Sequence, residues 1–198
     1  MTGAATGTPP ATGRRPLRRA VYVDRDGTVN PDFRYLKEAE RLEIYLGVAE
    51  AVRLLRQHGY LVVCVTNQSG IERGFYTVAD VERIHRRVNE LLAREGAVID
   101  AFYYCPHAPE TGCRCRKPGT ELFERAEREL GIARAGSAII GDRVLDIEAG
   151  DRLGLLTALV PSRGHESEVA RELSDRHIRP DLVAPSMRAA AARILAVG

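Results

Sequence analysis

The stretch that decides the fold is AVYVDRDGT, residues 20–28. Its first four residues are apolar and mostly β-branched or aromatic, and polar residues end the run abruptly. This pattern is typical of a short buried strand that runs into a turn. Two carboxylates, Asp24 and Asp26, follow the strand directly, and Gly27 permits a tight turn that brings both to one place.

Similar apolar runs recur along the chain at residues 61–65, 102–104, 138–140 and 155–160. Between them, apolar side chains recur at helical spacing within residues 48–55, 78–92 and 123–130, and residues 187–197 suggest a terminal helix. Thr77 is a suitable N-cap for the second of these helices, and Gly131 closes the third. Strands that alternate with helices indicate a parallel sheet covered on both faces. We therefore expect a Rossmann-like, three-layer α/β fold.

Length and charge set limits on the function. The chain has 198 residues and a formal net charge of +2, which fits one domain and gives no support for a nucleic-acid or membrane partner. No apolar run of about 18 residues is present, so no membrane span is expected. Residues 1–18 lack apolar content and a signal-peptide pattern. We predict a disordered tail over 1–18, one domain over 19–198, a cytoplasmic location and a monomer.

Polar residues follow the ends of the expected strands. In a parallel sheet, ligands bind beyond the carboxyl ends of the strands. The residues at those positions are Asp24 to Thr28, Thr66 to Gly70, Cys105 to His107, and Gly141 to Arg143. The sequence therefore predicts that the chemically capable side chains gather at one edge of the sheet.

The D-x-D-G-T motif suits metal and phosphoryl chemistry. Carboxylates are good ligands for a hard cation such as Mg²⁺, and an aspartate can attack phosphorus to form an acyl phosphate. A second carboxylate two residues on can act as a general acid. Asp24 and Asp26, taken alone, could equally form an Asp-rich turn without chemistry.

Three later segments could complete such a site. Thr66 and Asn67, with the backbone amides of residues 68–70, could hold phosphoryl oxygens, or they could form a polar loop. Lys117 suits a crowded phosphoryl oxygen because an ammonium is a compact point charge, although a solvated basic pair is the alternative. Asp142 is a third candidate metal ligand or a helix N-cap. Asp146 could contact Asp142 and orient it without binding the metal itself.

Three cysteines and one histidine lie within eleven positions, at Cys105, His107, Cys113 and Cys115. Three sulfurs and one imidazole make a complete tetrahedral set for a structural Zn²⁺, and free thiols are the alternative. Such a zinc loop over residues 105–115 would hold Arg116 and Lys117 in place.

Four motifs, DRDGT, TNQSG, the lysine of RKP, and GDRVLD, resemble those of the haloacid-dehalogenase-like phosphatases over about residues 20–185. The resemblance implies a HAD-like fold with Asp24 as nucleophile, Asp26 as acid and base, and Thr66 and Lys117 as phosphoryl stabilisers. It implies Mg²⁺ held by Asp24, the Asp26 carbonyl and Asp142. No segment is large enough for a separate cap domain.

Longer motifs narrow the resemblance to the D-glycero-D-manno-heptose 1,7-bisphosphate phosphatases and the related histidinol-phosphate phosphatases: DRDGTVN, TNQSGIERG, CPH and CxCRKP. The positions in and beside these motifs that are expected to contact substrate are Asp32, Phe33, Arg34, Tyr35, Asn67, Gln68, Ser69, Arg73, Arg116, Lys117 and Arg143. Arg73 and Arg116 could bind a second, non-reacting phosphate, or they could be solvated.

The expected substrate is a small phosphorylated metabolite, and the best candidate reaction removes the 7-phosphate of the heptose bisphosphate in carbohydrate metabolism. Two alternatives stay open, a histidinol-phosphate phosphatase and a zinc-stabilised binding protein without catalysis. The sequence departs from the resemblance beside the substrate loop, where RKPGTELF replaces the usual RKPxPGM and the segment between His107 and Cys113 is short.

Overall fold

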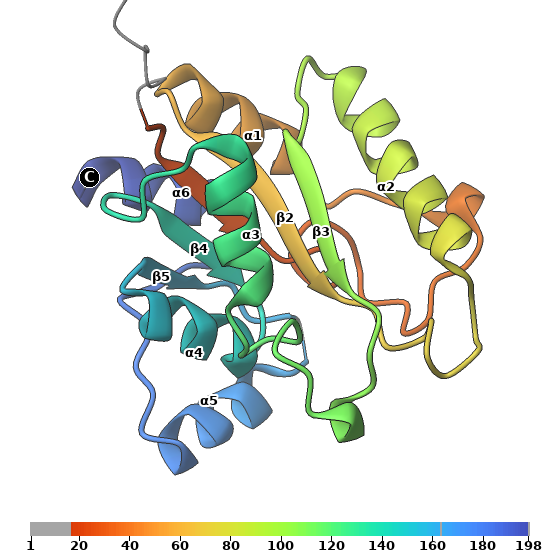
Figure 1. Cartoon of the computed structure of the whole chain (residues 1–198). Coiled ribbons are helices and arrows are strands. Elements are labelled where there is room, and N and C mark those ends of the chain that lie inside the picture. Colours follow the sequence, from red (N-terminus) through yellow and green to blue (C-terminus); the bar gives the residue numbers. More distant parts are fainter. Residues whose placement is uncertain (1–16, 163, 198) are drawn as a thin grey trace, which may run out of the picture.

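The computed structural model describes residues 17–162 and 164–197. Its centre is a parallel sheet of six strands in the order β3-β2-β1-β4-β5-β6 (Figure 1). The strands are β1 (Ala20–Val23), β2 (Leu61–Asn67), β3 (Ala101–Cys105), β4 (Ala138–Gly141), β5 (Leu156–Leu159) and β6 (Leu182–Val183). The five strands predicted from the sequence are confirmed, and the two-residue β6 is an addition at the edge.

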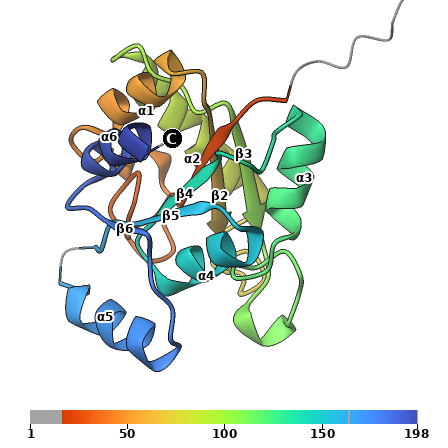
Figure 2. The ribbon, with the colours of Figure 1, turned by 90° about the vertical axis from the view of Figure 1, so that its left-hand side faces the viewer.

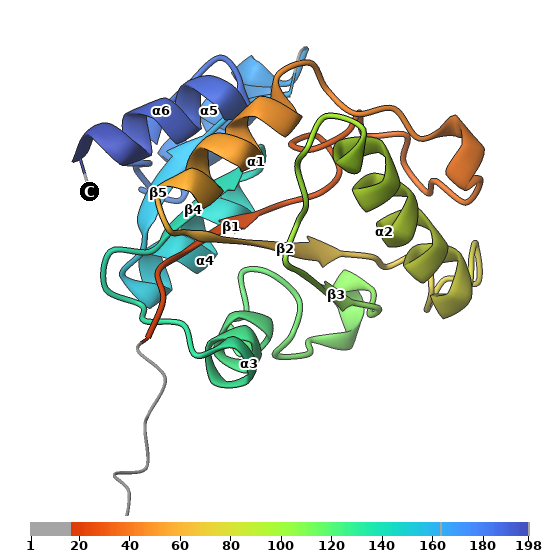
Figure 3. The ribbon, with the colours of Figure 1, turned by 90° about the horizontal axis from the view of Figure 1, so that it is seen from above.

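Helices cover both faces of the sheet, so the predicted three-layer α/β fold is confirmed (Figures 2 and 3). Side chains of α1, α2 and α6 share one apolar cluster with one face of the strands, and side chains of α3 and α4 pack on the other face. A smaller cluster joins α5 to α4 and β5. The helices are α1 (Val48–Gln57), α2 (Val78–Ala93), α3 (Glu121–Leu130), α4 (Val144–Leu153), α5 (Glu166–Asp175) and α6 (Met187–Val197).

The expected helix signals act as the sequence indicated. The Thr77 hydroxyl accepts a hydrogen bond from the N–H of Asp80, and the Asp80 side chain accepts one from the N–H of Thr77. This reciprocal pair is a capping box, which fixes where α2 begins. Gly131, with φ of 66°, ends α3 in a left-handed conformation that glycine adopts without strain.

The register of the central strands aligns their carboxyl ends. Val23, the last residue of β1, lies opposite Cys64 of β2 and Ile140 of β4. The residues that follow these three positions therefore emerge at one edge of the sheet, where a parallel sheet binds ligands. Only short segments surround that edge, with 3₁₀ turns at Ala39–Arg41 and Pro109–Thr111, so within the described residues no cap domain is inserted.

The predicted tail over residues 1–18 falls mostly on residues 1–16, which lie outside the described residues. Arg18 is described, and its backbone N–H donates to the carbonyl of Gly131 at 3.0 Å. The folded chain therefore includes Arg18, one residue before the expected start of the domain. Among the described residues, no helix is both long and apolar enough to cross a bilayer.

Candidate active site

Three carboxylates converge at the carboxyl edge of the sheet. Asp24 follows β1, Asp142 follows β4, and Asp146 lies in the first turn of α4; their nearest oxygens all lie within 4.8 Å of one another. Two glycines make room for this approach. A Cβ on Gly27 would lie 2.1 Å from Asp142 Oδ2, and one on Gly141 would lie 2.3 Å from Asp146 Cβ.

The cluster fits a divalent cation. Burial raises the pKa of Asp24 to about 6, against the lowering charge of Lys117. Burial and the charges of Asp24 and Asp146 raise the pKa of Asp142 to about 8. The Ser162 hydroxyl donates to Asp142 Oδ2 at 2.6 Å, while the buried Asp142 Oδ1 has no hydrogen-bond partner among the described residues. An unpartnered carboxylate oxygen beside two further carboxylates is the donor set that Mg²⁺ prefers.

Lys117 links two of these carboxylates. Its ammonium lies 2.9 Å from Asp24 Oδ1 and 2.5 Å from Asp146 Oδ1, and it donates to the carbonyl of Val65 at 2.7 Å. Burial alone would lower the pKa of Lys117, but the charges of Asp146 and Asp24 outweigh burial and raise it. The side chain is therefore a buried, fixed positive charge beside Asp24.

The backbone of Lys117 is anchored by Asn67. Asn67 Oδ1 accepts from the N–H of Lys117 at 3.0 Å, and Asn67 Nδ2 donates to the carbonyl of Lys117 at 3.2 Å. Asn67 was expected to hold phosphoryl oxygens directly. In the structure its side chain instead positions the residue that carries the positive charge.

Asp26 lies beside the carboxylate cluster in a separate hydrogen-bond network. Arg25 donates to both of its oxygens, at 3.2 and 2.7 Å, while Asn30 and Gln68 donate at 3.0 and 2.9 Å. Burial favours the protonated form, but the charge of Arg25 and these hydrogen bonds outweigh it and lower the pKa of Asp26. The carboxylate is thus held ionised and oriented at the rim of a cavity.

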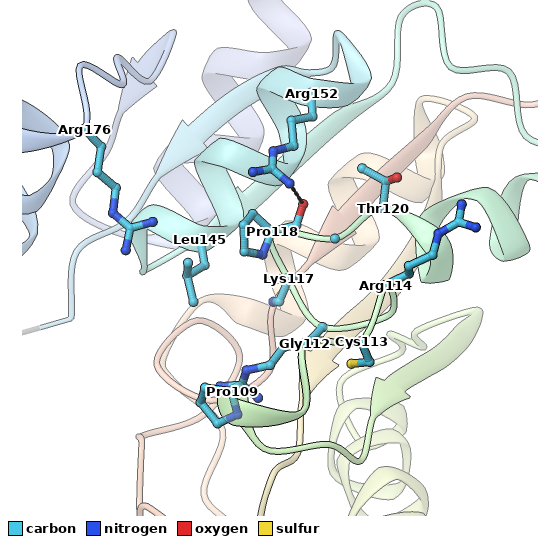
Figure 4. Close-up of a pocket in the computed structure, with 12 residues that line it drawn as sticks. Pro109, Gly112, Cys113, Arg114, Lys117, Pro118, Thr120, Leu145, Arg152 and Arg176 are labelled. Carbon is cyan, nitrogen blue, oxygen red and sulfur yellow. Dashed lines mark hydrogen bonds between the residues drawn. The ribbon is translucent and has the colours of Figure 1, made fainter.

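Two cavities with charged side chains in their lining flank the site. The smaller, of about 350 Å³, is lined by Asp26, Asp32, Arg34, Tyr35, Leu36, Asn67, Gln68, Ser69 and Tyr76. The larger, of about 780 Å³, lies between residues 109–120 and α4. Its lining includes Lys117 and four arginines, namely Arg114, Arg116, Arg152 and Arg176, and no carboxylate of the described chain. Figure 4 shows two of the lining residues in contact, where Arg152 donates a hydrogen bond to the carbonyl of Pro118 at 3.2 Å.

Four zinc-type ligands converge at the end of β3. The Cys115 sulfur lies 3.1 Å from that of Cys105 and 3.4 Å from that of Cys113. His107 Nδ1 lies 3.3 Å from the Cys115 sulfur. Ligand atoms of a tetrahedral zinc are about 3.7 Å apart, given Zn–S bonds of about 2.3 Å. The geometry therefore fits a closed structural zinc site.

Comparison with known proteins agrees with the geometry. The family model described as HAD-hydrolase-like matches residues 114–190, and that of polynucleotide kinase 3 phosphatase matches residues 23–151. The D-glycero-beta-D-manno-heptose-1,7-bisphosphate 7-phosphatase of Haemophilus ducreyi is 36% identical over 74% of this chain and 85% of its own length. The corresponding enzyme of Chlorobaculum tepidum is 37% identical over 85% of this chain and 90% of its own length.

The chain belongs to the haloacid-dehalogenase-like phosphatases. Within that family it groups with the heptose-bisphosphate phosphatases. A solved D,D-heptose 1,7-bisphosphate phosphatase from B. bronchiseptica, complexed with magnesium and phosphate, superposes with a TM-score of 0.80 at 31% identity. The match covers 91% of this chain and 99% of that one. The predicted family and fold are confirmed, and by family the chain is a phosphomonoester hydrolase.

The structure brings some of the expected substrate residues of this phosphatase to the site and leaves others outside the smaller cavity. Arg143 Nη2 lies 3.4 Å from Asp32 Oδ2, so these two residues meet across the cavity rim. Phe33 instead packs against the apolar cluster that α1, α2 and α6 share with the sheet. Arg73 is paired with Glu110 at 3.2 Å, and Arg116 donates to the carbonyl of His107 at 3.1 Å.

The structure excludes two possibilities that the sequence left open. The backbone N–H of Gln68, which could have held a phosphoryl oxygen, donates instead to the carbonyl of Cys105 at 2.7 Å because β2 still pairs with β3 there. The alternative of Asp142 as a helix N-cap is also excluded. Arg143 is the N-cap residue of α4, and Asp146 accepts its N–H at 3.0 Å.

Sequence reasoning missed Arg25, Tyr76, His85 and Ser162. Arg25 is 1% exposed and stands at the variable position of D-x-D, so the motif gave no reason to weigh it. His85 Nε2 lies 3.4 Å from Arg25 Nη1, and the His85 ring stacks on Phe102 at 4.5 Å. Burial and then the charge of Arg25 lower the pKa of His85 to about 3, so the imidazole is neutral.

Proposed function

We propose that this chain is a magnesium-dependent phosphatase that acts on a sugar bisphosphate. The reaction we propose is removal of the 7-phosphate of D-glycero-D-manno-heptose 1,7-bisphosphate. The observation that carries the proposal is the meeting of Asp24, Asp142 and Asp146 with the buried ammonium of Lys117 at the sheet edge. A place in carbohydrate metabolism, a cytoplasmic location and a monomeric state remain predictions from the sequence.

In the first step, an oxygen of Asp24 attacks phosphorus, and the bond from phosphorus to the sugar oxygen breaks. Asp26 is ionised at rest, so it first takes up a proton from solvent in the cavity that it lines, and it then gives that proton to the departing sugar oxygen, which leaves as an alcohol. In the second step, water attacks the phosphorus of the phospho-aspartate, Asp26 accepts a proton from that water, and Asp24 is released. The ionised state in which Arg25 holds Asp26 suits this second role.

Other side chains stabilise the transferred group. Phosphoryl transfer depends mainly on placement and on neutralising charge at the equatorial oxygens. Lys117 supplies a fixed positive charge next to Asp24, and the Thr66 hydroxyl, which accepts a hydrogen bond from Gln68 at 2.9 Å, keeps its own hydrogen free to donate.

Asp24, Asp142 and the backbone carbonyl of Asp26 would hold magnesium, with Asp146 behind them. When bound, the ion supplies positive charge to the phosphoryl oxygens and orients them. Two properties of Asp142 support this assignment: its Oδ1 has no hydrogen-bond partner among the described residues, and its pKa is raised. Both indicate that the cluster without an ion lacks positive charge.

The charges around the cavities favour an anionic substrate. Asp32 is the carboxylate at the rim besides Asp26, and Arg143 neutralises it at 3.4 Å. Arg34 lines the same cavity, and the larger cavity carries Arg116 beside Lys117. A second, non-reacting phosphate would find a counter-charge on either side, which supports a bisphosphate. The relatives in this family are named for a heptose bisphosphate.

We propose that Cys105, His107, Cys113 and Cys115 bind one structural zinc. Cys115 is followed directly by Arg116 and Lys117, and Arg116 donates back to the carbonyl of the ligand His107. Closing this loop on zinc would fix the backbone from which Lys117 reaches Asp24. The zinc would have no open coordination position, so its role would be structural.

The alternatives differ in what they require of the site. A histidinol-phosphate phosphatase needs an acidic group aimed at the substrate amine, and Asp32 is already paired with Arg143. A binding protein without catalysis has no need for a nucleophile beside a buried lysine. The geometry of Asp24 and Lys117 therefore favours an enzyme, and the neutralised rim favours a sugar bisphosphate.

A phosphate-release assay with magnesium tests the proposal. The panel is the heptose 1,7-bisphosphate, fructose 1,6-bisphosphate, histidinol phosphate and an oligonucleotide with a 3′-phosphate. We expect the highest kcat/KM with the heptose bisphosphate. A preference for histidinol phosphate or for the oligonucleotide would refute the substrate, and release from none of the four would refute the activity.

The nucleophile is tested by Asp24→Asn, which is expected to lose phosphate release while it keeps the thermal unfolding midpoint. Asp151→Asn is the matched control, because Asp151 is exposed near the end of α4, whereas Asp146 of the cluster is buried in the first turn of that helix. It should keep wild-type turnover. Wild-type activity in Asp24→Asn would exclude a phospho-aspartate at this position.

A further inference from the structure

The side-chain amide of Gln68 lies at the centre of a buried hydrogen-bond network. Gln68 is 2% exposed, and its Nε2 donates to Asp26 Oδ2 and to Thr66 Oγ1, both at 2.9 Å. Its Oε1 accepts from the hydroxyl of Tyr76 at 2.7 Å and from Arg25 Nη2 at 3.2 Å. All four hydrogen-bonding positions of the amide are therefore used inside the protein.

The chemistry of the neighbours fixes which way this amide points. A guanidinium only donates, so the oxygen of Gln68 must face Arg25. An ionised carboxylate only accepts, so the nitrogen must face Asp26. Gln68 therefore joins the proposed acid and base, Asp26, to the proposed phosphoryl ligand, Thr66. It has no N–H left for substrate, although the sequence suggested a substrate contact.

Tyr76 completes this network from outside the sheet. It lies at the end of the loop that connects β2 to α2, it is 5% exposed, and its ring packs against Gly70 of the same loop. A Cβ on Gly70 would lie 2.4 Å from that ring, so the close approach depends on glycine. Burial raises the pKa of Tyr76 to about 12, which keeps the hydroxyl protonated and able to donate.

We propose that Tyr76 is a positioning residue for proton transfer: its hydroxyl orients the Gln68 amide, which in turn holds Asp26 and Thr66 in their working arrangement. The inference rests on the proposed function, because it assigns Tyr76 a role in the reaction of Asp26. It makes the loop over residues 68–77 part of the machinery that protonates the leaving group, in addition to shaping the cavity.

The test compares two esters of nearly the same shape, phenyl phosphate and p-nitrophenyl phosphate. Phenol is the more basic leaving group, so its departure depends more on a proton from Asp26. The ratio kcat/KM reports the step in which the leaving group departs. For Tyr76→Phe we expect kcat/KM to fall roughly tenfold further for phenyl phosphate than for p-nitrophenyl phosphate, as a partial loss of general-acid catalysis.

A second variant moves the ring without removing the hydroxyl. Gly70→Ala places a methyl group where the Tyr76 ring lies, so it should show the same selective loss. Tyr103→Phe is the matched control, because it removes a hydroxyl that donates to Glu129 at 2.8 Å on the α3 side of the sheet. This control should leave kcat/KM unchanged for both esters. Thermal unfolding midpoints check that each variant folds.

The results for Tyr76→Phe either support or overturn the proposed role of Tyr76. An equal fall for both esters in Tyr76→Phe would mean that Tyr76 acts only on the structure or on phosphate binding, and no fall would mean that Gln68 keeps its place alone. Either result overturns the inference while the phosphatase function stands. A wild-type protein that releases phosphate from neither ester and from none of the four compounds of the panel refutes the function itself, and the role of Tyr76 with it.

Discussion

Replacing Lys117 by methionine tests whether the charge balance of the site also determines its stability. Lys117 is 3% exposed and pairs with Asp24 at 2.9 Å and Asp146 at 2.5 Å, carboxylates that are 9% and 1% exposed. Methionine keeps the volume and removes the charge. Breaking a buried pair by removing one partner costs about 3–5 kcal/mol, because the other charge is left buried. We expect a loss of that size in the free energy of unfolding.

Urea unfolding of the magnesium-free protein measures this loss. With a slope of about 2 kcal/mol per molar urea, the midpoint should fall by roughly 1.5–2.5 M. The double variant Lys117→Met/Asp146→Asn should recover part of the loss, since one carboxylate no longer lacks a partner. Excess magnesium should reduce the difference in urea midpoint between Lys117→Met and the wild type, because the bound cation replaces the missing positive charge.

An exposed ion pair provides the control. Arg125 and Glu129 lie 2.7 Å apart on α3, with side chains that are 58% and 47% exposed. Arg125→Met should cost less than about 1 kcal/mol, as exposed pairs do. If Lys117→Met cost no more than Arg125→Met, the reasoning that ties stability to buried charge at this site would be wrong.

Three further predictions follow from the same region. Protein purified without chelator should contain about one zinc per chain, and zinc removal should lower the thermal unfolding midpoint; protein that folds normally with no zinc would contradict this. In magnesium-free protein the pKa of Asp24 is raised to about 6 and that of Asp142 to about 8. The folded state therefore binds more protons than the unfolded chain, and the free energy of unfolding should fall as the pH rises from about 6 to about 8. Magnesium needs ionised carboxylates and should therefore raise the unfolding midpoint more at pH 8 than at pH 6, an expectation that equal shifts would exclude. Gly27→Ala should weaken magnesium binding, because its Cβ would lie 2.1 Å from Asp142 Oδ2, whereas Gly59→Ala, at a similar φ of 83° with nothing within 4 Å, should strain the backbone alone.

The sequence predicts most of the fold because strong local signals coincide with the elements that bury apolar surface. Three elements were not predicted. They are α5, where only Val169 is buried along the ten residues of Glu166–Asp175, the two-residue β6, and α4, whose ten residues were considered only for the carboxylates at its start. The site residues could be predicted where their position at the end of a strand determines their place, as for Asp24 after β1 and Asp142 after β4. They could not be predicted where loop conformation decides, as for Tyr76, which meets Gln68 only because the loop folds over Gly70.

The charge count at the sheet edge links the metal requirement to the chemistry. Asp24, Asp142 and Asp146 face one buried ammonium and the partly exposed guanidinium of Arg143, whose Nε lies 3.4 Å from Asp142 Oδ2. The fully ionised cluster therefore still carries more negative than positive charge, which a buried site tolerates poorly. Without an ion, protons relieve the excess, and burial raises the pKa of Asp142 to about 8 and that of Asp24 to about 6. A protonated Asp24 is a poor nucleophile. A divalent cation removes the same excess while leaving Asp24 ionised, so the property that makes the cluster bind magnesium is also the one that makes Asp24 reactive at neutral pH.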